Sequence, residues 1–91
     1  MRVRLTPRAV RELLAQTDWL SQRSPTAARA ASKAIRATVE RAALFPLAAP
    51  LVDETHRDVR VRFGRDGFFV RYRLEGDEMV VVGVFHGRQL R

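Results

Sequence analysis

Residues 57–86 read RDVRVRFGRDGFFVRYRLEGDEMVVVGVFH, and this stretch decides the fold because three strand patterns follow one another in it. Over 59–63, apolar residues alternate with arginine, which is the period of a strand with one buried face. Apolar and basic residues alternate again over 68–74, whereas 79–86 is apolar on both faces, as expected of a central strand. The sequences GRDG and EGD between these patterns are typical of tight turns. The stretch therefore predicts a meander of three strands.

Upstream of the meander, the sequence predicts two amphipathic helices that share a start signal. At positions 6 and 24, a hydroxyl residue that can cap a helix precedes a proline suited to the first helical turn. The helices are expected over about 7–22 and 25–44, and Pro46 ends the second. The expected inner faces are Val10, Leu13, Leu14, Thr17 and Leu20 in the first helix, and Ala28, Ala31, Ile35, Thr38, Val39 and Ala42 in the second.

A short strand is expected before the first helix, because Val3 and Leu5 alternate with arginine. The order of elements is then strand, helix, helix and three strands. It predicts an α+β fold of two layers, with the helical hairpin on one face of a mostly antiparallel four-strand sheet. The irregular segment 47–56 is expected to be a surface connection in which Leu51 and Val52 pack on the core. Residues 1–91 are expected to form one domain.

The composition favours an acidic partner. The net charge is +7, and every basic residue except Lys33 is arginine, which binds phosphates and carboxylates with two hydrogen bonds. The charge could equally serve solubility alone. There is no cysteine and there are only two histidines, so neither a metal site nor a cofactor is expected. Neither a membrane-spanning run nor a signal-peptide pattern is found, so a cytoplasmic location is expected.

Four arginines are expected to gather on the sheet face opposite the helices, namely Arg60, Arg62, Arg71 and Arg73. Arg60 and Arg71 should lie across the first hairpin from each other or one pair removed. Like charges this close repel unless an acidic group or a phosphate lies between them, which favours a bound partner. The alternative is a charged face that serves only solubility. Phe69 on the same face could contact a partner or pack under the guanidinium groups.

Six short motifs occur in order along the chain: VRLTPRA (3–9), SPTAAR (24–29), LFP (44–46), VRVRF (59–63), FVRYR (69–73) and VGVFHGR (82–88). In this order and spacing they resemble the ParE/RelE superfamily of toxins from type II toxin-antitoxin systems. The resemblance covers nearly the whole chain, and it implies the two-layer fold described above. It also implies a cognate antitoxin, ParD-like or similar, whose flexible acidic C-terminal segment folds on the toxin.

The two branches of the superfamily imply different activities. Resemblance to the RelE-like branch implies a ribosome-dependent mRNA endonuclease. Its chemistry needs a proton acceptor, a proton donor and cations. Here His86 is the candidate base, Lys33 is expected on a helix far from the sheet, and Tyr72 is assigned to the core. RelE-like members commonly carry a tyrosine or basic residues a few places after the terminal histidine, and no tyrosine follows His86 in this sequence. The resemblance therefore favours the ParE-like branch, which implies inhibition of DNA gyrase by binding and no catalytic residue. The alternatives are a RelE-like endonuclease and a basic nucleic-acid-binding module without toxicity.

Residue roles follow from this interpretation. The residues expected to bind the target are Arg60, Arg62, Arg71, Arg73, His86 and Arg88. The residues expected to bind the antitoxin are Trp19, Arg60, Phe69 and Arg71. Trp19 could instead be a partly buried aromatic that closes the helical hairpin, and His86 could be structural. Arg88 and Arg91 on the short tail are candidates for intermolecular contact, and His56 is interpreted as loop surface.

Overall fold

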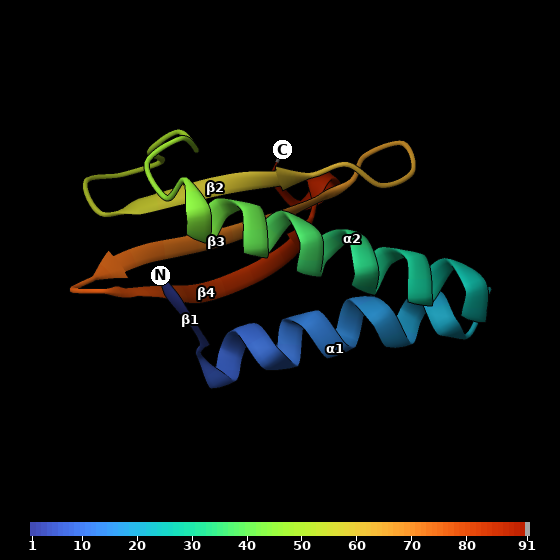
Figure 1. Ribbon diagram of the computed structural model, residues 1–91. Coiled ribbons are helices and arrows are strands. Elements are labelled where there is room, and N and C mark those ends of the chain that lie inside the picture. The colour runs from blue at the N-terminus through green and yellow to red at the C-terminus, as the bar shows by residue number, and fades with distance from the viewer. Residues whose placement is uncertain (91) are drawn as a thin grey trace.

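The computed structural model describes residues 1–90. The chain forms β1 (Arg2–Leu5), α1 (Pro7–Ser21), α2 (Pro25–Leu44), β2 (His56–Val61), β3 (Phe68–Glu75), β4 (Glu78–His86) and a short 3-10 helix, η1 (Gly87–Leu90). The strands form one sheet in the order β1-β4-β3-β2, in which β1 is parallel to β4 and the other pairs are antiparallel. Both helices cover the same face of this sheet (Figure 1). The predicted two-layer α+β fold is therefore confirmed, with a mixed sheet.

The helix starts form as the sequence predicts. The Thr6 hydroxyl oxygen accepts a hydrogen bond from the Ala9 amide at 3.2 Å, and the Ser24 hydroxyl oxygen accepts one from the Ala27 amide at 3.1 Å. Each bond satisfies an amide that has no partner within its helix. The second helix ends at Leu44 as expected, and the first ends at Ser21, one residue early.

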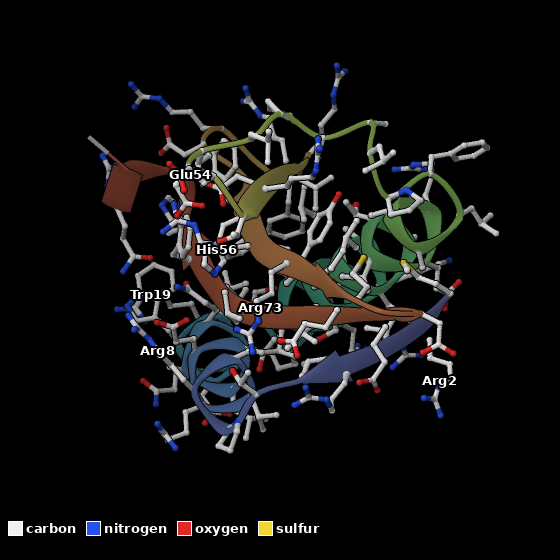
Figure 2. All side chains as sticks on the ribbon, turned by 90° about the vertical axis from the view of Figure 1, so that its left-hand side faces the viewer. Arg2, Arg8, Trp19, Glu54, His56 and Arg73 are labelled. Carbon is white, nitrogen blue, oxygen red and sulfur yellow. The ribbon has the colours of Figure 1, made fainter. Side chains whose placement is uncertain are left out.

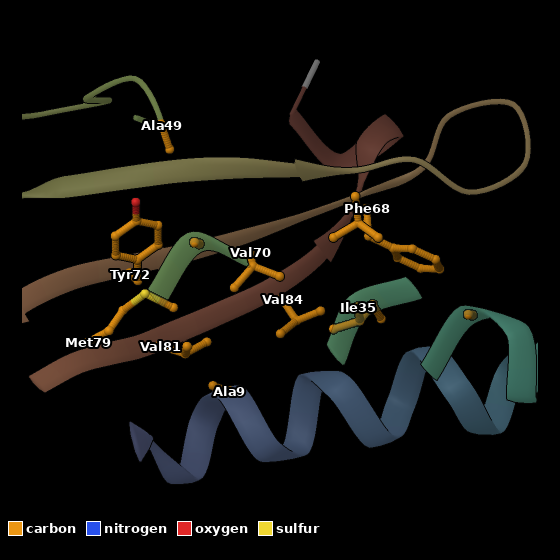
Figure 3. Packing of buried hydrophobic residues seen from close by; sticks show 12 residues of the cluster. Ala9, Ile35, Ala49, Phe68, Val70, Tyr72, Met79, Val81 and Val84 are labelled. Atoms are coloured by element: carbon orange, nitrogen blue, oxygen red, sulfur yellow. The ribbon is translucent and has the colours of Figure 1, made fainter. Parts of the chain in front are cut away.

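The core lies between the helices and the inner face of the sheet (Figure 3). Its largest fully buried side chain is Tyr72, whose hydroxyl donates a hydrogen bond to the Pro46 carbonyl at 2.6 Å. This bond ties β3 to the segment that follows α2. The predicted inner face of α2 is confirmed, because all of its members are buried or half-buried.

Two packing predictions are wrong. On α1, Leu13 and Leu20 pack on the core as predicted, but Val10 and Leu14 are 40% and 54% exposed, whereas Ala9 is fully buried. The small Ala9 side chain lets the helix approach the sheet closely, and this rotates the larger residues outward. In the loop, Leu51 and Val52 are exposed and Ala49 is buried instead, because Pro50 and Val52 form backbone hydrogen bonds along the edge of β2.

Because β1 is short, the second half of β4 has no neighbouring strand on the side away from β3. β1 pairs only with Glu78–Val81, so the amides farther along β4 need other acceptors. Glu12 of α1 supplies one, because its Oε1 accepts a hydrogen bond from the Val84 amide at 3.0 Å. The side chains of α1 therefore line this open edge of the sheet. Within residues 1–90, neither helix has the length and apolar character that a membrane span requires.

Candidate target-binding surfaces

Strand pairing places three of the four predicted arginines, Arg60, Arg71 and Arg73, on one face, which we call the outer face, whereas Arg62 follows the end of β2. Asp58 pairs with Arg71, and Arg60 pairs with Phe69. Directly paired residues point to the same side of a sheet, so Arg60 and Arg71 are one pair removed, which is one of the two expected arrangements. His56 joins this face as well, because it pairs with Arg73.

Arg71 is neutralised within the chain. Its guanidinium donates two hydrogen bonds to the Asp58 carboxylate, at 2.8 and 2.9 Å, and Asp58 is only 6% exposed. The hydrogen bonds to Asp58 raise the pKa of Arg71. Arg73 in turn contacts Glu75. The inference that repelling arginines require a partner is therefore wrong, because the acidic group beside Arg71 is Asp58 of the same chain.

Phe69 packs against its neighbours on the outer face. Its ring stacks on Phe85 with the centroids 6.5 Å apart, and the Arg71 guanidinium lies 5.0 Å from the centroid of Phe85. The guanidinium therefore lies over Phe85, and Phe69 itself packs on an aromatic ring. Phe69 remains half-buried, so part of its ring stays accessible.

A polar groove, which we call the outer groove, runs between α1 and the outer face. It encloses about 400 Å³, and its floor includes Gly83 and Phe85. Its polar lining includes Thr6, Arg8, Glu12, Asp53, His56, Arg71 and Arg73. Figure 2 shows Arg8, His56 and Arg73 projecting toward it from α1, β2 and β3. The groove therefore joins an imidazole, carboxylates and guanidinium groups from separate elements.

His56 is held in the outer groove by Asp53. The His56 Nδ1 lies 3.0 Å from Asp53 Oδ2, and the backbone amides of Thr55 and His56 donate to Oδ1. These amide bonds are the main reason that the pKa of Asp53 falls to about 2. The contact with Asp53 therefore fixes the Nδ1 side of the imidazole ring and leaves Nε2 as the nitrogen that can meet a partner. The interpretation of His56 as plain loop surface is therefore wrong. The Asp-x-x-His spacing was the signal that could have revealed this pair.

A second surface surrounds the turn between β2 and β3. We call Arg60, Arg62 and Arg88 the loop patch. Arg60 and Arg62 line a hollow beside this turn, and Arg88 lies 3.3 Å from Asp66 within the turn. The Gly87 amide donates to the Gly67 carbonyl at 3.0 Å, which ties η1 to the turn.

Gly67 is required for the geometry of this turn. Its φ is +67°, and a Cβ at this position would lie 2.4 Å from the Val61 carbonyl oxygen. The loop patch therefore rests on a backbone conformation that a larger residue would disturb.

His86 does not join the outer-face arginines. It pairs with the buried Phe68, so its side chain points to the helix side of the sheet. Its ring meets Phe68 edge to face at 5.7 Å, and Nδ1 accepts a hydrogen bond from the Arg88 amide at 3.2 Å. The predicted combination of His86 with the arginine cluster is therefore not assembled. The expectation for Arg91 lies outside the described residues.

Trp19 lies apart from the other residues expected to bind the antitoxin. It is 55% exposed on α1, and the Arg23 guanidinium lies 3.8 Å from its ring centroid. With Gln16, it lines a hollow that also includes His86 and Arg88. The Trp19 ring is therefore accessible, and it packs on Arg23 in the turn between the helices. In the described part of the chain, no three carboxylate or imidazole side chains lie close enough together to hold a metal ion.

Comparisons with known proteins bear on this arrangement. Residues 3–91 match the family model of the ParE toxin of type II toxin-antitoxin systems, parDE. Over 89 residues, the chain is 29% identical to Toxin RelE1 and 32% identical to Toxin RelE3 of Caulobacter vibrioides. Each alignment covers 98% of this chain, with 96% of RelE1 and 97% of RelE3.

A solved structure has the same fold. A chain of the chromosomal ParDE TA system from P. aeruginosa superimposes with a TM-score of 0.66 at 20% identity, covering 94% of this chain and 95% of that chain. At this identity, the likeness concerns the fold alone. The match of the family model over nearly the whole length shows more: this chain belongs to the ParE toxin family of type II toxin-antitoxin systems.

Proposed function

We propose that this toxin inhibits DNA gyrase by binding and that it has no substrate to cleave. One observation supports binding over catalysis: two outer-face arginines that a nuclease would use, Arg71 and Arg73, are bound to carboxylates of the same chain. Arg71 is held by Asp58, and Arg73 contacts Glu75. A guanidinium group engaged in this way has less capacity to stabilise the charge that develops on a reacting phosphate.

We assign the contact with gyrase to the loop patch. Arg60 and Arg62 are exposed, and neither forms an ion pair among the described residues. The Arg88 side chain is 68% exposed despite its contact with Asp66. Cations that are fixed in place and still open to solvent can meet acidic groups of a partner, and they also speed the encounter.

We place the antitoxin contact near the end of α2. Leu44, Phe45 and Leu47 are each more than 60% exposed there. Of these, Phe45 lines a hollow of about 350 Å³ between α2 and β2, whose lining also includes Arg41 and Arg60. Apolar anchors beside cations suit a segment that is acidic and folds on binding. Of the residues expected to bind the antitoxin, Arg60 lies at this site.

A supercoiling assay with purified gyrase tests the proposal. Excess toxin should abolish supercoiling and increase the amount of cleaved DNA, and prior addition of the antitoxin should prevent both effects. The variant R60Q/R62Q should inhibit at least tenfold less. The matched control R2Q/R4Q loses the same charge from β1 and should inhibit as the unmodified toxin does. Normal supercoiling at excess toxin would exclude gyrase as the target.

A ribosome-dependent mRNA endonuclease is the second candidate function, because the outer groove holds a histidine oriented by a carboxylate beside cations. His56 Nε2 could accept the proton of a ribose 2′-hydroxyl while Arg8 and Arg73 lie near the phosphate. The relatives in Caulobacter vibrioides carry RelE names.

Cleavage of ribosome-bound mRNA distinguishes the two candidates. The endonuclease requires cleavage that the variant H56A loses and that H86A retains, because His86 points to the other side of the sheet. Gyrase inhibition predicts that neither variant matters in a supercoiling assay and that the message stays intact.

A further inference from the structure

The tip of the helical hairpin carries positive charge that neither proposed contact uses. We define the tip as the end of α1, the turn and α2 as far as residue 39, over residues 19–39. This segment contains Arg23, Arg29, Lys33 and Arg36 and not one acidic residue. In Figure 1, the turn between α1 and α2 projects beyond the strands on the right-hand side.

Three of these cations form a row on α2. Arg29, Lys33 and Arg36 are spaced four and three residues apart, which places them on one face of the helix. They line a hollow between the helices, and all three are exposed. None of them forms an ion pair among residues 1–90. The row rises by about 10 Å along the helix axis.

The lining of the hollow favours phosphates over an acidic protein. Besides the cations, it consists of short side chains, namely Thr17, Ser21, Ala28 and Ser32, together with Asp18. A folding peptide would need apolar pockets for its anchors, and large apolar side chains are absent from the lining of this hollow. A phosphate backbone needs only cations and polar groups at regular spacing. Each strand carries one phosphate per about 3.4 Å of the duplex axis, so a row of about 10 Å that lies along this axis faces about three phosphates.

We propose that the hairpin tip binds the phosphate backbone of duplex DNA, with Arg29, Lys33 and Arg36 as the contact residues. The inference rests on the proposed function only for the choice of DNA, since gyrase holds a duplex while it works. The toxin would then contact gyrase through the loop patch and the DNA through the tip.

Binding of the purified toxin to a fluorescent 20-base-pair duplex, measured by anisotropy, tests this directly. Three phosphate contacts predict that the affinity falls about 40-fold between 50 and 200 mM salt. The variant R29Q/K33Q/R36Q should lose at least tenfold in affinity and most of the salt dependence. The control R2Q/R4Q/R11Q has the same net charge and should bind as the unmodified toxin does.

Asp18 provides a variant that a folding defect cannot mimic. It is the one carboxylate in the hollow, so D18N should tighten DNA binding by about two- to fourfold. Equal losses of duplex affinity in R29Q/K33Q/R36Q and R2Q/R4Q/R11Q would overturn the proposal, because the effect would then come from net charge alone. It would also fail if R29Q/K33Q/R36Q bound the duplex normally and lost only the antitoxin.

The outcomes separate this inference from the proposed function. Gyrase inhibition by a toxin that does not bind the duplex would refute DNA binding by the hairpin tip and would leave gyrase as the proposed target. Duplex binding that depends on Arg29, Lys33 and Arg36, without any effect on gyrase, would support DNA binding by the hairpin tip and refute gyrase as the target.

Discussion

Breaking the Asp58–Arg71 pair should destabilise the toxin unequally from its two sides. R71A leaves the carboxylate of Asp58, which is 6% exposed, without a partner, and an unpaired buried charge costs about 3–5 kcal/mol. D58A removes the same two hydrogen bonds. The Arg71 side chain is 35% exposed and can recover water, so this change should cost about 2–3 kcal/mol.

Urea unfolding followed by circular dichroism measures these costs. In a thermal melt of a domain of this size, either change should lower Tm by at least about 8 °C. The double variant D58A/R71A should cost less than R71A alone, because it leaves no orphaned charge. R73A is the control, since its partner Glu75 is 48% exposed, and it should cost less than about 1 kcal/mol. The reasoning fails if R71A lowers the free energy of unfolding no more than D58A does. It also fails if the loss in D58A/R71A equals the sum of the two single losses.

Three further predictions concern other contacts. E12A should accelerate hydrogen exchange at the Val84 amide at least tenfold, because that amide loses its acceptor; an unchanged rate by NMR would contradict the contact. Y72F should cost about 1–2 kcal/mol in urea unfolding by leaving the Pro46 carbonyl unpaired, and a cost near zero would show that the bond contributes nothing. Asp53 should titrate in carbon NMR at about pH 2, below its ordinary 3.8. Because this pKa is lowered on folding, the carboxylate stabilises the fold above about pH 4, and the contribution is lost as the pH falls toward 2; a midpoint at the ordinary value would refute it.

Local patterns were sufficient to predict the elements and their order. The inner face of α2 followed from its period, and the strands followed from alternation and turn residues. The inner face of α1 was predicted in part: Leu13 and Leu20 pack on the core, but periodicity also favoured Val10 and Leu14, which are exposed. The structure instead buries Ala9, where close approach matters more than size.

The sites depended on information that no local pattern contains. The pairing of Asp58 with Arg71 follows from the register of two strands. The outer groove takes residues from α1, β2 and β3, so its histidine and its arginines meet only once the chain has folded. His86 was expected to bind the target together with these arginines, but the register turns it to the opposite side of the sheet.

Stoichiometry tests most directly whether this toxin acts by binding. Toxin is titrated into a fixed amount of gyrase, and the residual supercoiling rate is followed over time, with antitoxin added at the end. The account predicts that inhibition grows with added toxin up to about equimolar, stays constant in time and is reversed by the antitoxin. Progressive loss of supercoiling at far less than equimolar toxin, or full activity at every ratio, would contradict it.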